Sequence, residues 1–466
     1  MTEQTGHSNR SDRTSLPTRC MVAAAAGALL SLAFPPYRFV FVIPLALAVF
    51  IAVLEEASPR EGFITGICFG YPWSAITLFW LTRLFGSASI SLWAIAACWP
   101  ALFGAALAWC SSRRARIPAW LAAPALCVAL EVLREQVVWP RTSVGGIAYA
   151  ALGGAPLWPI AAVAGSYGVS FLLVMLATQI ARTRFRPRIG IAALASWGAV
   201  CLLPRSPMRP EHPVVIRLVQ AQSEDDSVHF ALSTVPARRR LDAILWSEYS
   251  FMSDPRWNPK LWQKLRALAA DQHALFVFGA RDVPNRSTDA YFNAAFVIGS
   301  NGTVLGVHHK NHPVPMFRDG TPGRDARVFP AAFGRVGVAI CYDLDSPDVS
   351  LRLARNGAQL LLAPSDNPAR WGPVQNAQQR QILRMRSAET GLWLAAADTA
   401  GSTFACDSHG ASVARVVTAG PTMIDVPVAM AHRTTIFVRG GWMFGWLCLV
   451  SALVAIAAPG DRKQVA

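Results

Sequence analysis

The chain has 466 residues, of which 53% are hydrophobic and 15% are charged. Ordinary soluble domains carry about a quarter charged residues, so this composition excludes a plain soluble globule, and the apolar content excludes disorder over most of the chain. The formal net charge of +15 favours a membrane over a nucleic acid as the partner, because basic loops in a chain this apolar act as topology signals.

Long apolar runs follow a polar N-terminal segment, residues 1–19. A helix that crosses the hydrocarbon core of a bilayer needs about 20 mainly apolar residues, with about 17 at the lower end. We predict a transmembrane domain of seven helices over residues 20–204 and one more transmembrane helix within residues 436–466. The first, second and seventh runs are short by this measure. The predicted spans are Cys20–Phe34, Phe39–Leu54, Gly62–Leu81, Ile90–Trp109, Ile117–Leu133, Pro156–Ile180, Ile189–Leu203 and Gly440–Ala458.

The first span has an alternative interpretation as a cleaved signal peptide. A basic segment precedes the small residues Ala23–Ala26, as in a secretory signal. Further apolar spans follow at once, which suits a retained anchor better.

Basic residues gather in the segments that flank these spans. With eight spans, all the clusters fall on one side, which marks that side as cytoplasmic. We therefore expect both termini in the cytoplasm, as a tail over residues 1–19 and a short tail after the last span, and residues 205–435 on the opposite face. The residues concerned are Arg10, Arg13, Arg19, Arg113, Arg114, Arg116, Arg182, Arg184, Arg186, Arg188, Arg462 and Lys463.

Residues 205–435 differ in kind, because short β-rich runs alternate with helical stretches. The β-rich runs are continuously apolar, which is typical of strands covered on both faces of a sheet. The pattern indicates an α/β domain that is long enough to bury its own core. The predicted strands are Val214–Gln222, Ala243–Ser247, Ala274–Gly279, Asn293–Ile298, Val336–Cys341, Leu360–Pro364 and Trp393–Ala397, and the predicted helices are Asn258–Asp271, Val349–Asn356 and Val374–Thr390.

Glu248 and Cys341 each come at the end of one of these strands, and Lys310 follows a glycine turn and a further short strand within Gly306–Lys310. Reactive groups of α/β sheets gather just beyond the carboxyl ends of strands, so these three residues can converge on one pocket. The alternative interpretation is a buried core cysteine, a surface carboxylate and a solvated lysine.

The three residue types form a coherent chemical set. A thiolate is a strong nucleophile towards a carbonyl carbon, and a nearby cation lowers the pKa of the thiol. A carboxylate can take the thiol proton and return it to a leaving group, while an ammonium can donate to the oxyanion of a tetrahedral intermediate. The set therefore suffices for acyl transfer through a thioester. A lysine at such a position indicates a need for a compact ammonium, because the chain has only four lysines, Lys260, Lys264, Lys310 and Lys463.

Motifs in both halves of the chain resemble those of a known family. With their spacing and flanks, Glu248, Lys310 and Cys341 resemble the Glu–Lys–Cys triad of the nitrilase (carbon–nitrogen hydrolase) superfamily. The apolar spans on either side are similar to its membrane branch, the bacterial apolipoprotein N-acyltransferases, and the resemblance covers nearly the whole chain. The matching segments are Gly27–Pro36, Arg141–Gly146, Gly165–Ser170, Tyr291–Ala295, Ile340–Tyr342 and Arg386–Gly391.

This resemblance implies a multi-pass α-helical membrane domain joined to an α/β nitrilase-like domain, an αββα sandwich over residues 205–435. It implies that Glu248 is the general base, that Lys310 stabilises the oxyanion and that Cys341 is the nucleophile. The residues expected to bind the substrate are Asn293, Arg318, Asp319, Tyr342 and Asp343.

The chain departs from the family pattern beside these residues. The family's second glutamate falls on Arg318, although Asp319 can serve in its place, and Asp343 stands where the family usually has glutamate. The segment between Lys310 and Cys341 is also shorter than in typical acyltransferases of this kind and is nearer that of soluble nitrilases. These departures bear on the identity of the substrate more than on the triad.

The resemblance implies an enzyme of the bacterial inner (cytoplasmic) membrane whose catalytic domain is periplasmic. It would move an acyl chain from a phospholipid, through a cysteine thioester, to the α-amino group of the N-terminal diacylglyceryl-cysteine of lipoproteins. The expected partners are a phospholipid donor, a lipoprotein acceptor and membrane lipid, with no nucleic acid and no cofactor, and the protein is expected to be a monomer. One alternative is a membrane-anchored nitrilase-like amidase that hydrolyses a carbon–nitrogen bond, and another is a lipid-binding scaffold without activity.

Other residues that could bind metal have simpler interpretations. The nine cysteines show no CxxC or zinc-like spacing, so neither a disulfide framework nor a structural metal is indicated. His308, His309 and His312 could be metal ligands, but adjacent histidines on a strand point to opposite faces, which favours turn and surface roles. No metal is expected.

Two further groups have open interpretations. Cys406 and His409 could form a nucleophile–base pair, but the segment that contains them is more simply interpreted as a strand end and a β-turn. Glu131, Arg134 and Glu135 lie near the outer end of the fifth span, where they could pack at an interface or contact lipid headgroups.

Overall fold

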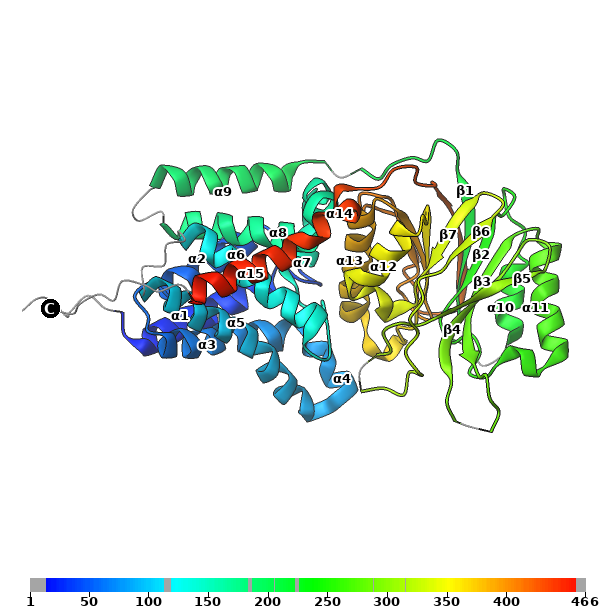
Figure 1. Cartoon of the computed structure of the whole chain (residues 1–466), viewed down its shortest axis with the longest axis horizontal. Helices are drawn as coiled ribbons and strands as arrows, with labels where there is room; N and C mark the ends of the chain where they lie inside the picture. Colours follow the sequence, from blue (N-terminus) through cyan, green and yellow to red (C-terminus); the bar gives the residue numbers. More distant parts are fainter. Residues whose placement is uncertain are drawn as a thin grey trace, which may run out of the picture.

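The computed structural model describes residues 14–112, 119–182, 187–204, 206–222, 226–287, 289–314 and 316–457. The chain forms a helical unit and an α/β unit that lie end to end along the long axis of the molecule (Figure 1). The first half of the chain builds the helical unit, the chain then crosses to build the α/β unit, and the C-terminal helix α15 (Phe444–Ala457) returns to the helical unit.

The helical unit is held together by close helix–helix contact. Where α3 and α5 cross, a side chain on Gly66 would overlap the backbone of Ala101, so glycine lets the two helices approach closely. The α-helices of the unit are α1 (Leu16–Ser31), α2 (Val42–Val53), α3 (Pro59–Thr77), α4 (Thr82–Phe85), α5 (Ser89–Ser112), α6 (Ala119–Val132), α7 (Ile147–Gly154), α8 (Trp158–Ala181), α9 (Pro187–Leu202), α14 (Ile436–Arg439) and α15. Its shorter turns are η1 (Phe79–Leu81), η2 (Gly86–Ala88), η8 (Gly441–Met443) and the π-helical η3 (Leu133–Val137).

A helix occupies each of the eight segments that we predicted as spans. Within the described ranges, two helices, Phe79–Ser112 and Trp158–Ala181, are long and apolar enough to cross a membrane. Shorter apolar helices are Leu16–Ser31, Val42–Val53, Pro187–Leu202 and Gly441–Ala457. Most of the basic residues that we used to orient the spans lie outside the described residues, namely Arg10, Arg13, Arg113, Arg114, Arg116, Arg184, Arg186, Arg462 and Lys463.

The α/β unit contains two six-stranded sheets. The first has the order β12-β1-β2-β3-β4-β5 and the second β11-β10-β9-β8-β7-β6, and in each the parallel strands (β1-β2-β3 and β7-β8-β9) lie at the centre. The strands are β1 (Val214–Gln220), β2 (Ala243–Trp246), β3 (Leu275–Asp282), β4 (Phe292–Ile298), β5 (Val304–His309), β6 (Val328–Ala331), β7 (Gly334–Val338), β8 (Leu360–Pro364), β9 (Trp393–Ala397), β10 (Phe404–Cys406), β11 (Ser412–Arg415) and β12 (Thr422–Val428).

The sheets face each other across an apolar core, and helices cover their outer faces, which makes the expected αββα sandwich (Figure 1). Helices α10 (Asp226–Ser233) and α11 (Pro259–Asp271) cover the first sheet, and α12 (Pro347–Arg355) and α13 (Pro373–Thr390) cover the second. Every residue of β1, β2, β8 and β9 is buried, as their continuous apolar runs predicted. The sequence analysis did not predict β6, β11, β12 or α10.

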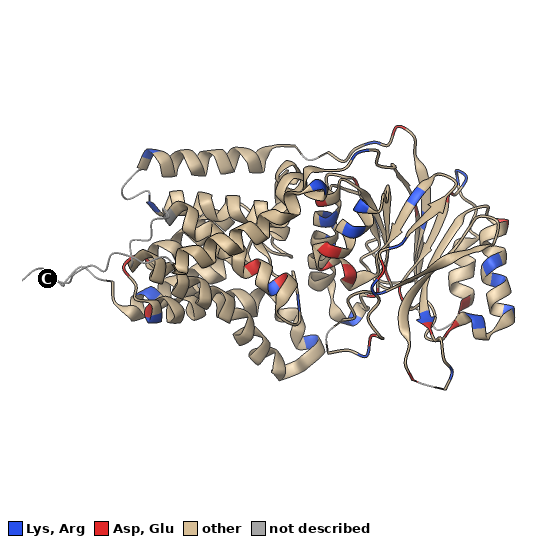
Figure 2. Ribbon diagram, in the orientation of Figure 1, with Lys and Arg blue, Asp and Glu red and all other residues tan. Residues whose placement is uncertain are grey.

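The helix α13 joins the two units, because it lies between the second sheet and the helical unit (Figure 1). Trp80 donates from Nε1 to the amide oxygen of Gln378 on α13 at 3.0 Å, and the same amide donates to the carbonyl of Thr77 at 2.8 Å. Charged residues are sparse in the helical unit and gather in the α/β unit and along the contact between the two (Figure 2). The contact between the two units therefore contains charged and hydrogen-bonding side chains, whereas the rest of the helical unit contains few charged residues.

Candidate active site

Glu248, Lys310 and Cys341 come together at one edge of the sandwich. Glu248 follows β2, Lys310 follows β5, and Cys341 opens a short 3₁₀ turn, η6 (Cys341–Leu344), after β7. All three are buried, with exposed fractions of 2%, 1% and 4%. We predicted that the strand runs on to Cys341, and this was wrong, because β7 ends at Val338 and Cys341 already belongs to the turn.

Cys341 has an unusual backbone conformation. Its φ angle is 46°, in the left-handed region that residues other than glycine rarely adopt. Such a conformation costs on the order of 1–3 kcal/mol and persists only where the surroundings hold it. Here the carboxylate of Asp343 accepts a hydrogen bond from the N–H of Ile340 at 3.0 Å, and the N–H of Asp343 donates to the carbonyl of Ile340 at 2.9 Å. The turn therefore points the sulfur away from the strand.

Lys310 lies between two carboxylates. Its Nζ donates to Oε1 of Glu248 at 2.8 Å and to Oδ2 of Asp319 at 2.7 Å. The amide of Asn293 bridges the same two groups, donating to Glu248 at 2.6 Å and to Asp319 at 2.8 Å. Oε2 of Glu248 has no hydrogen-bond partner among the described residues, so this oxygen is available to take a proton.

Burial and the neighbouring charges set the protonation of these groups. Burial raises the pKa of Glu248 to about 7, with Lys310 opposing and Asp319 adding to the rise. For Lys310, burial lowers the pKa, but Glu248 and Asp319 outweigh it and hold the pKa well above its ordinary value. Lys310 is therefore a permanent cation, and Glu248 can exchange a proton near neutral pH.

The thiol of Cys341 is protonated in the resting site. Burial raises its pKa well above the ordinary value, Glu248 adds to the rise, and Lys310 opposes it. The ammonium of Lys310 does lower this pKa, as we expected of a nearby cation, but burial and the carboxylate of Glu248 outweigh it. The nucleophile thus depends on a base that removes its proton during the reaction, and Glu248 is suited to that step. Gln379 on α13 donates to the sulfur at 3.3 Å.

A cavity of about 490 Å³ opens from Cys341 towards the helical unit. Its wall is mostly apolar, and the loop after Lys310 closes one side of it with Val314, Met316 and Phe317. Phe317 lies 6.4 Å from Phe85 of α4 between ring centroids, so this short loop still reaches the helical unit. The other lining residues include Trp73, Thr77, Leu78, Trp80, Leu81, Leu84, Leu92, Ile95, Ala96, Trp99, Trp139, Val144, Trp371 and Ile382.

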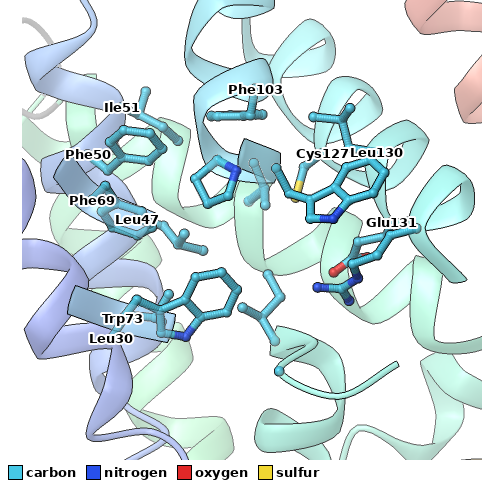
Figure 3. A pocket seen from close by; sticks show the side chains of 16 residues that line it. Leu30, Leu47, Phe50, Ile51, Phe69, Trp73, Phe103, Cys127, Leu130 and Glu131 are labelled. Atoms are coloured by element: carbon cyan, nitrogen blue, oxygen red, sulfur yellow. The ribbon is translucent and has the colours of Figure 1, made fainter. Parts of the chain in front are cut away.

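A second, smaller cavity of about 90 Å³ lies inside the helical unit (Figure 3). Phe50, Phe69 and Phe103 surround it on one side, and Glu131 lies at its opposite end (Figure 3). Four residues line both cavities, so the two cavities adjoin. These shared residues are Trp73, Trp99, Arg134 and Gly145. Trp73 and Trp99 thus belong to the walls of both cavities.

The predicted substrate-binding residues divide into two groups. Asn293 and Asp319 contact Lys310 or Glu248, as described above, and Tyr342 lines the cavity while its hydroxyl donates to the carbonyls of Pro140 and Arg141 at 3.3 and 3.2 Å. Tyr342 thereby ties the turn that carries the sulfur to the helical unit.

Two predicted substrate-binding residues, Asp343 and Arg318, are not among the residues that line the cavity. The carboxylate of Asp343 is fully buried and accepts hydrogen bonds from the N–H groups of Asn311 and His312 at 2.7 and 2.8 Å, so it holds the loop after Lys310. The side chain of Arg318 is exposed. Asp319 supplies the carboxylate beside Lys310 instead, so Arg318 in place of the family's glutamate leaves Lys310 with its acidic partner.

The three histidines each contact a different carboxylate. His308 lies 3.1 Å from Asp343, His309 lies 2.7 Å from Asp282, and His312 lies 2.8 Å from Asp348. Over the residues with described positions, no group of three histidine, cysteine or acidic side chains could hold a metal ion.

Cys406 and His409 also have separate partners. The sulfur of Cys406 lies 3.2 Å from the hydroxyl of Ser387, and the ring of His409 stacks on Trp158 at 3.6 Å between centroids. Cys406 and His409 therefore each have a separate contact partner, which favours a structural role for these two residues over a catalytic one.

Sequence reasoning missed Gln379 and Tyr249. The hydroxyl of Tyr249 donates to Asp319 at 2.7 Å, and the Gln379 amide reaches the sulfur of Cys341. Tyr249 directly follows Glu248, a position that could have suggested a role. Gln379 lies on a helix far along the chain, and only the packing of that helix brings it to the site.

Comparison with known proteins places the chain in a family. A family model for the apolipoprotein N-acyltransferase N-terminal domain matches residues 26–179, and one for carbon–nitrogen hydrolases matches residues 220–431. Apolipoprotein N-acyltransferases of Geobacter metallireducens and Pseudomonas putida are 25% and 26% identical, and the alignments cover 97% and 93% of this chain and 98% and 95% of theirs. The solved structure of a Saccharomyces cerevisiae nitrilase-superfamily protein is 19% identical, with a TM-score of 0.41 over 48% of this chain and 92% of that one. With both family models in order along one chain and full-length relatives, the chain belongs to the apolipoprotein N-acyltransferase family of the nitrilase superfamily and is an acyltransferase.

Proposed function

We propose that this enzyme transfers an acyl chain from a phospholipid to the α-amino group of the N-terminal diacylglyceryl-cysteine of lipoproteins, through a thioester on Cys341. The names of the relatives support the acceptor class. The observation that carries the proposal is the single cavity that joins the sulfur of Cys341 to an apolar wall built by the helical unit. A buried thiol with a base and a cation can attack an ester, and an apolar cavity at the same sulfur suits an acyl chain.

The first half-reaction forms the thioester. Glu248 takes the proton of the Cys341 thiol as the sulfur attacks the ester carbonyl of the phospholipid. The carbonyl oxygen becomes an oxyanion, which the ammonium of Lys310 stabilises. When the intermediate collapses, the carbon–oxygen bond of the ester breaks, and Glu248 returns the proton to the alkoxide of the departing lysophospholipid.

The second half-reaction transfers the acyl chain. The free α-amino group of the lipoprotein attacks the thioester carbonyl, and Lys310 again stabilises the oxyanion. Glu248 takes a proton from the attacking nitrogen and gives it to the departing sulfur, so that an amide forms and the thiol of Cys341 is restored.

We further propose that the helical unit spans the bacterial inner membrane with eight helices and that the α/β unit is periplasmic. The domain limits are those expected from the sequence, with a tail over residues 1–19, seven helices over 20–204, the catalytic domain over 205–435 and the last helix and tail over 436–466. Support comes from the apolar helices and from large apolar side chains on the outside of the unit, among them Ile90, Ile95, Leu102, Ile191, Leu447 and Leu453. The enzyme is proposed to act as a monomer without a cofactor.

The alternative of a nitrilase-like amidase has less support. It rested on the short segment after Lys310 and on Arg318. That segment closes the cavity with apolar residues, and the side chain of Arg318 is exposed. A cavity wall of this kind favours a lipid over a small amide.

Trapping the acylated enzyme tests the proposal. The full-length protein in detergent micelles is incubated with a phospholipid of known chains and without acceptor, and the modified residue and its mass are read by mass spectrometry. A fatty acyl group on Cys341 that moves to the amine of an added diacylglyceryl lipopeptide supports the proposal, with Cys406→Ser as the matched control and Cys341→Ala as the blank. Release of free fatty acid or ammonia as the main product would contradict it.

A further inference from the structure

Asp345 lies beside the reactive sulfur but has no part in the reaction described so far. It follows the turn η6 that begins at Cys341, and its N–H donates to the carbonyl of Tyr342 at 3.0 Å. Its own carbonyl accepts hydrogen bonds from the hydroxyl of Ser143 and, at 3.4 Å, from Nη2 of Arg386. The residue is 3% exposed and lines the same cavity as Cys341. Its position is therefore fixed in the wall of the proposed substrate cavity.

The guanidinium of Arg386 contacts the backbone of Asp345 and gives its other hydrogen bonds to different groups. Nη1 pairs with Glu389, Nε donates to the carbonyl of Leu344 at 3.0 Å, and Nη2 donates to the hydroxyl of Tyr149 at 2.6 Å. The single long contact to Asp345 ends on its carbonyl, so the carboxylate receives no hydrogen bond from this cation.

The other cations near the cavity are paired as well. Arg134 pairs with Glu135 at 3.2 Å, and Lys310 is held between its two carboxylate partners. Across the described ranges of the chain, Asp345 forms no ion pair, and its Oδ1 has no hydrogen-bond partner. Buried carboxylates are normally paired or fully hydrogen-bonded, so an oxygen left free in a cavity wall calls for a partner from outside the protein.

The protonation of Asp345 is compatible with such a partner. Burial raises its pKa to about 7, Arg386 lowers it and Glu135 raises it, while the N–H of Ser143 and the charge of Lys310 lower it. A carboxyl group with this pKa is partly ionised at neutral pH, and an incoming cation would draw it fully into the charged form.

The rest of the cavity wall limits what that cation can be. Among its lining residues, Arg134 has the one basic side chain and Asp345 the one carboxyl group, and the others are apolar or neutral. A divalent metal prefers several oxygen ligands, which one carboxylate does not supply. An amine on a lipid or on a lipidated peptide fits an apolar cavity with one carboxylate, because its ammonium pairs with the oxygen while its chain contacts the wall.

We propose that Asp345 binds the primary ammonium of a lipid substrate beside Cys341. This inference rests on the proposed function and extends it, because it assigns a recognition residue for the amine. The ammonium can belong to the headgroup of the phospholipid donor, where it stays charged, or to the acceptor, where it must first lose a proton to solvent so that the free amine can attack. Asp345 is a binding residue in both cases and takes no part in the covalent steps.

The half-reactions of Asp345→Asn, measured separately, test the proposal and distinguish the two sources. The first assay follows thioester formation on the full-length protein with phosphatidylethanolamine or phosphatidylglycerol in the same micelles, since only the former carries an amine. The second follows transfer from the preformed thioester to a diacylglyceryl lipopeptide. Asp348→Asn is the matched control, because Asp348 is partly exposed and does not line the cavity.

A donor headgroup bound by Asp345 predicts that kcat/KM for phosphatidylethanolamine falls by about tenfold in Asp345→Asn, while that for phosphatidylglycerol stays within about twofold. If Asp345 instead binds the acceptor, thioester formation by Asp345→Asn should equal that of the wild type with both donors. The KM of this variant for the lipopeptide should then rise by about tenfold. Asp345→Glu, which keeps the charge, should retain most of either preference.

Two results would overturn the inference. One is an Asp345→Asn enzyme that matches the wild type in both half-reactions. The other is an equal loss with both donors and an unchanged lipopeptide KM, which would mark Asp345 as a structural residue only. The wild-type enzyme distinguishes failure of this inference from failure of the proposed function. If no thioester forms on Cys341 of the wild type, the proposed function itself is wrong.

Discussion

The helical unit and the α/β unit differ in what surrounds their apolar residues. In the α/β unit the two sheets bury their apolar side chains against each other and against four helices, and charged residues lie around this core (Figure 2). In the helical unit large apolar side chains such as Leu102, Ile191 and Leu453 also lie on the outside. The first arrangement is stable in water, and the second needs an apolar surround, which supports the proposed membrane location.

The two units also contribute different parts of the site. Glu248, Lys310 and Cys341 lie just past strand ends of the α/β unit, where paired backbone holds them rigidly. The helical unit supplies most of the apolar wall of the cavity and no member of the triad. Reactivity therefore belongs to the α/β unit and substrate fit to the helical unit, and changes in each unit should have separable effects.

The largest expected effect follows from Lys310→Met in the α/β unit. The change removes the donor to the oxyanion and leaves Glu248 and Asp319 facing each other without a cation. We expect thioester formation to slow by about 10²–10³-fold and the free energy of unfolding to fall by about 3–5 kcal/mol. Rapid-quench kinetics and chemical denaturation measure these, with Lys260→Met on the exposed surface of α11 as the control. A variant within tenfold of the wild type would remove Lys310 from the reaction.

The next effect is the pH dependence of thioester formation. Glu248 can accept the thiol proton only as a carboxylate, and its pKa is raised to about 7. The rate should therefore fall by about tenfold for each unit that the pH drops below about 7. The rate of acylation between pH 5.5 and 8 measures this, and the residual rate of Glu248→Gln should not follow the same curve. A flat profile for the wild type would show that another group is the base.

A smaller and more selective effect is expected from Ala96→Trp in the helical unit. Ala96 lines the cavity on α5, so a tryptophan there fills part of the space for the acyl chain. We expect kcat/KM to fall by about tenfold for donors with long chains but little for donors with short chains. A series of phospholipids of increasing chain length measures this, and Leu102→Trp on the outside of the same helix is the control. An equal loss for all lengths would mean that the chain lies elsewhere.

The smallest effect is expected from Arg318→Glu, which restores the residue type that the family resemblance implies. The side chain of Arg318 is exposed, and Asp319 already occupies the acidic position beside Lys310. Activity should stay within about twofold, as for most surface changes. Steady-state kinetics with the natural classes of donor and acceptor test this. A large gain would show that Arg318 bears on the substrate and that the geometry at Asp319 is not sufficient.

Much of the fold could be predicted from the sequence, because continuous apolar runs specify buried strands and long apolar helices without reference to distant residues. The missed strands β6, β11 and β12 are partly exposed edge strands, β6 has only four residues, and β11 and β12 mix polar and apolar residues, so their pairing depends on neighbouring strands. Short edge strands of this kind have no strong local signal.

The residues that we predicted to bind the substrate have different surroundings in the structure, and their roles stay predictions. Asn293 and Asp319 were expected near Lys310, and their side chains do converge with it. Asp343 accepts hydrogen bonds from the N–H groups of Asn311 and His312 in the loop after Lys310, and the side chain of Arg318 is exposed. Residue spacing along the chain does not carry this information, because a change in one φ angle redirects every side chain after it.

The amino-acid sequence by itself determined the division into an apolar helical half and an α/β half, the identity of the three chemical groups and the family to which they belong. These depend on composition, periodicity and local motifs, which are properties of neighbouring residues. Only the tertiary structure decided that the thiol is protonated at rest, that Gln379 and Asp345 lie beside it and that the two units share one cavity. These depend on burial and on contacts between residues far apart in the chain, which exist only once the units have packed together.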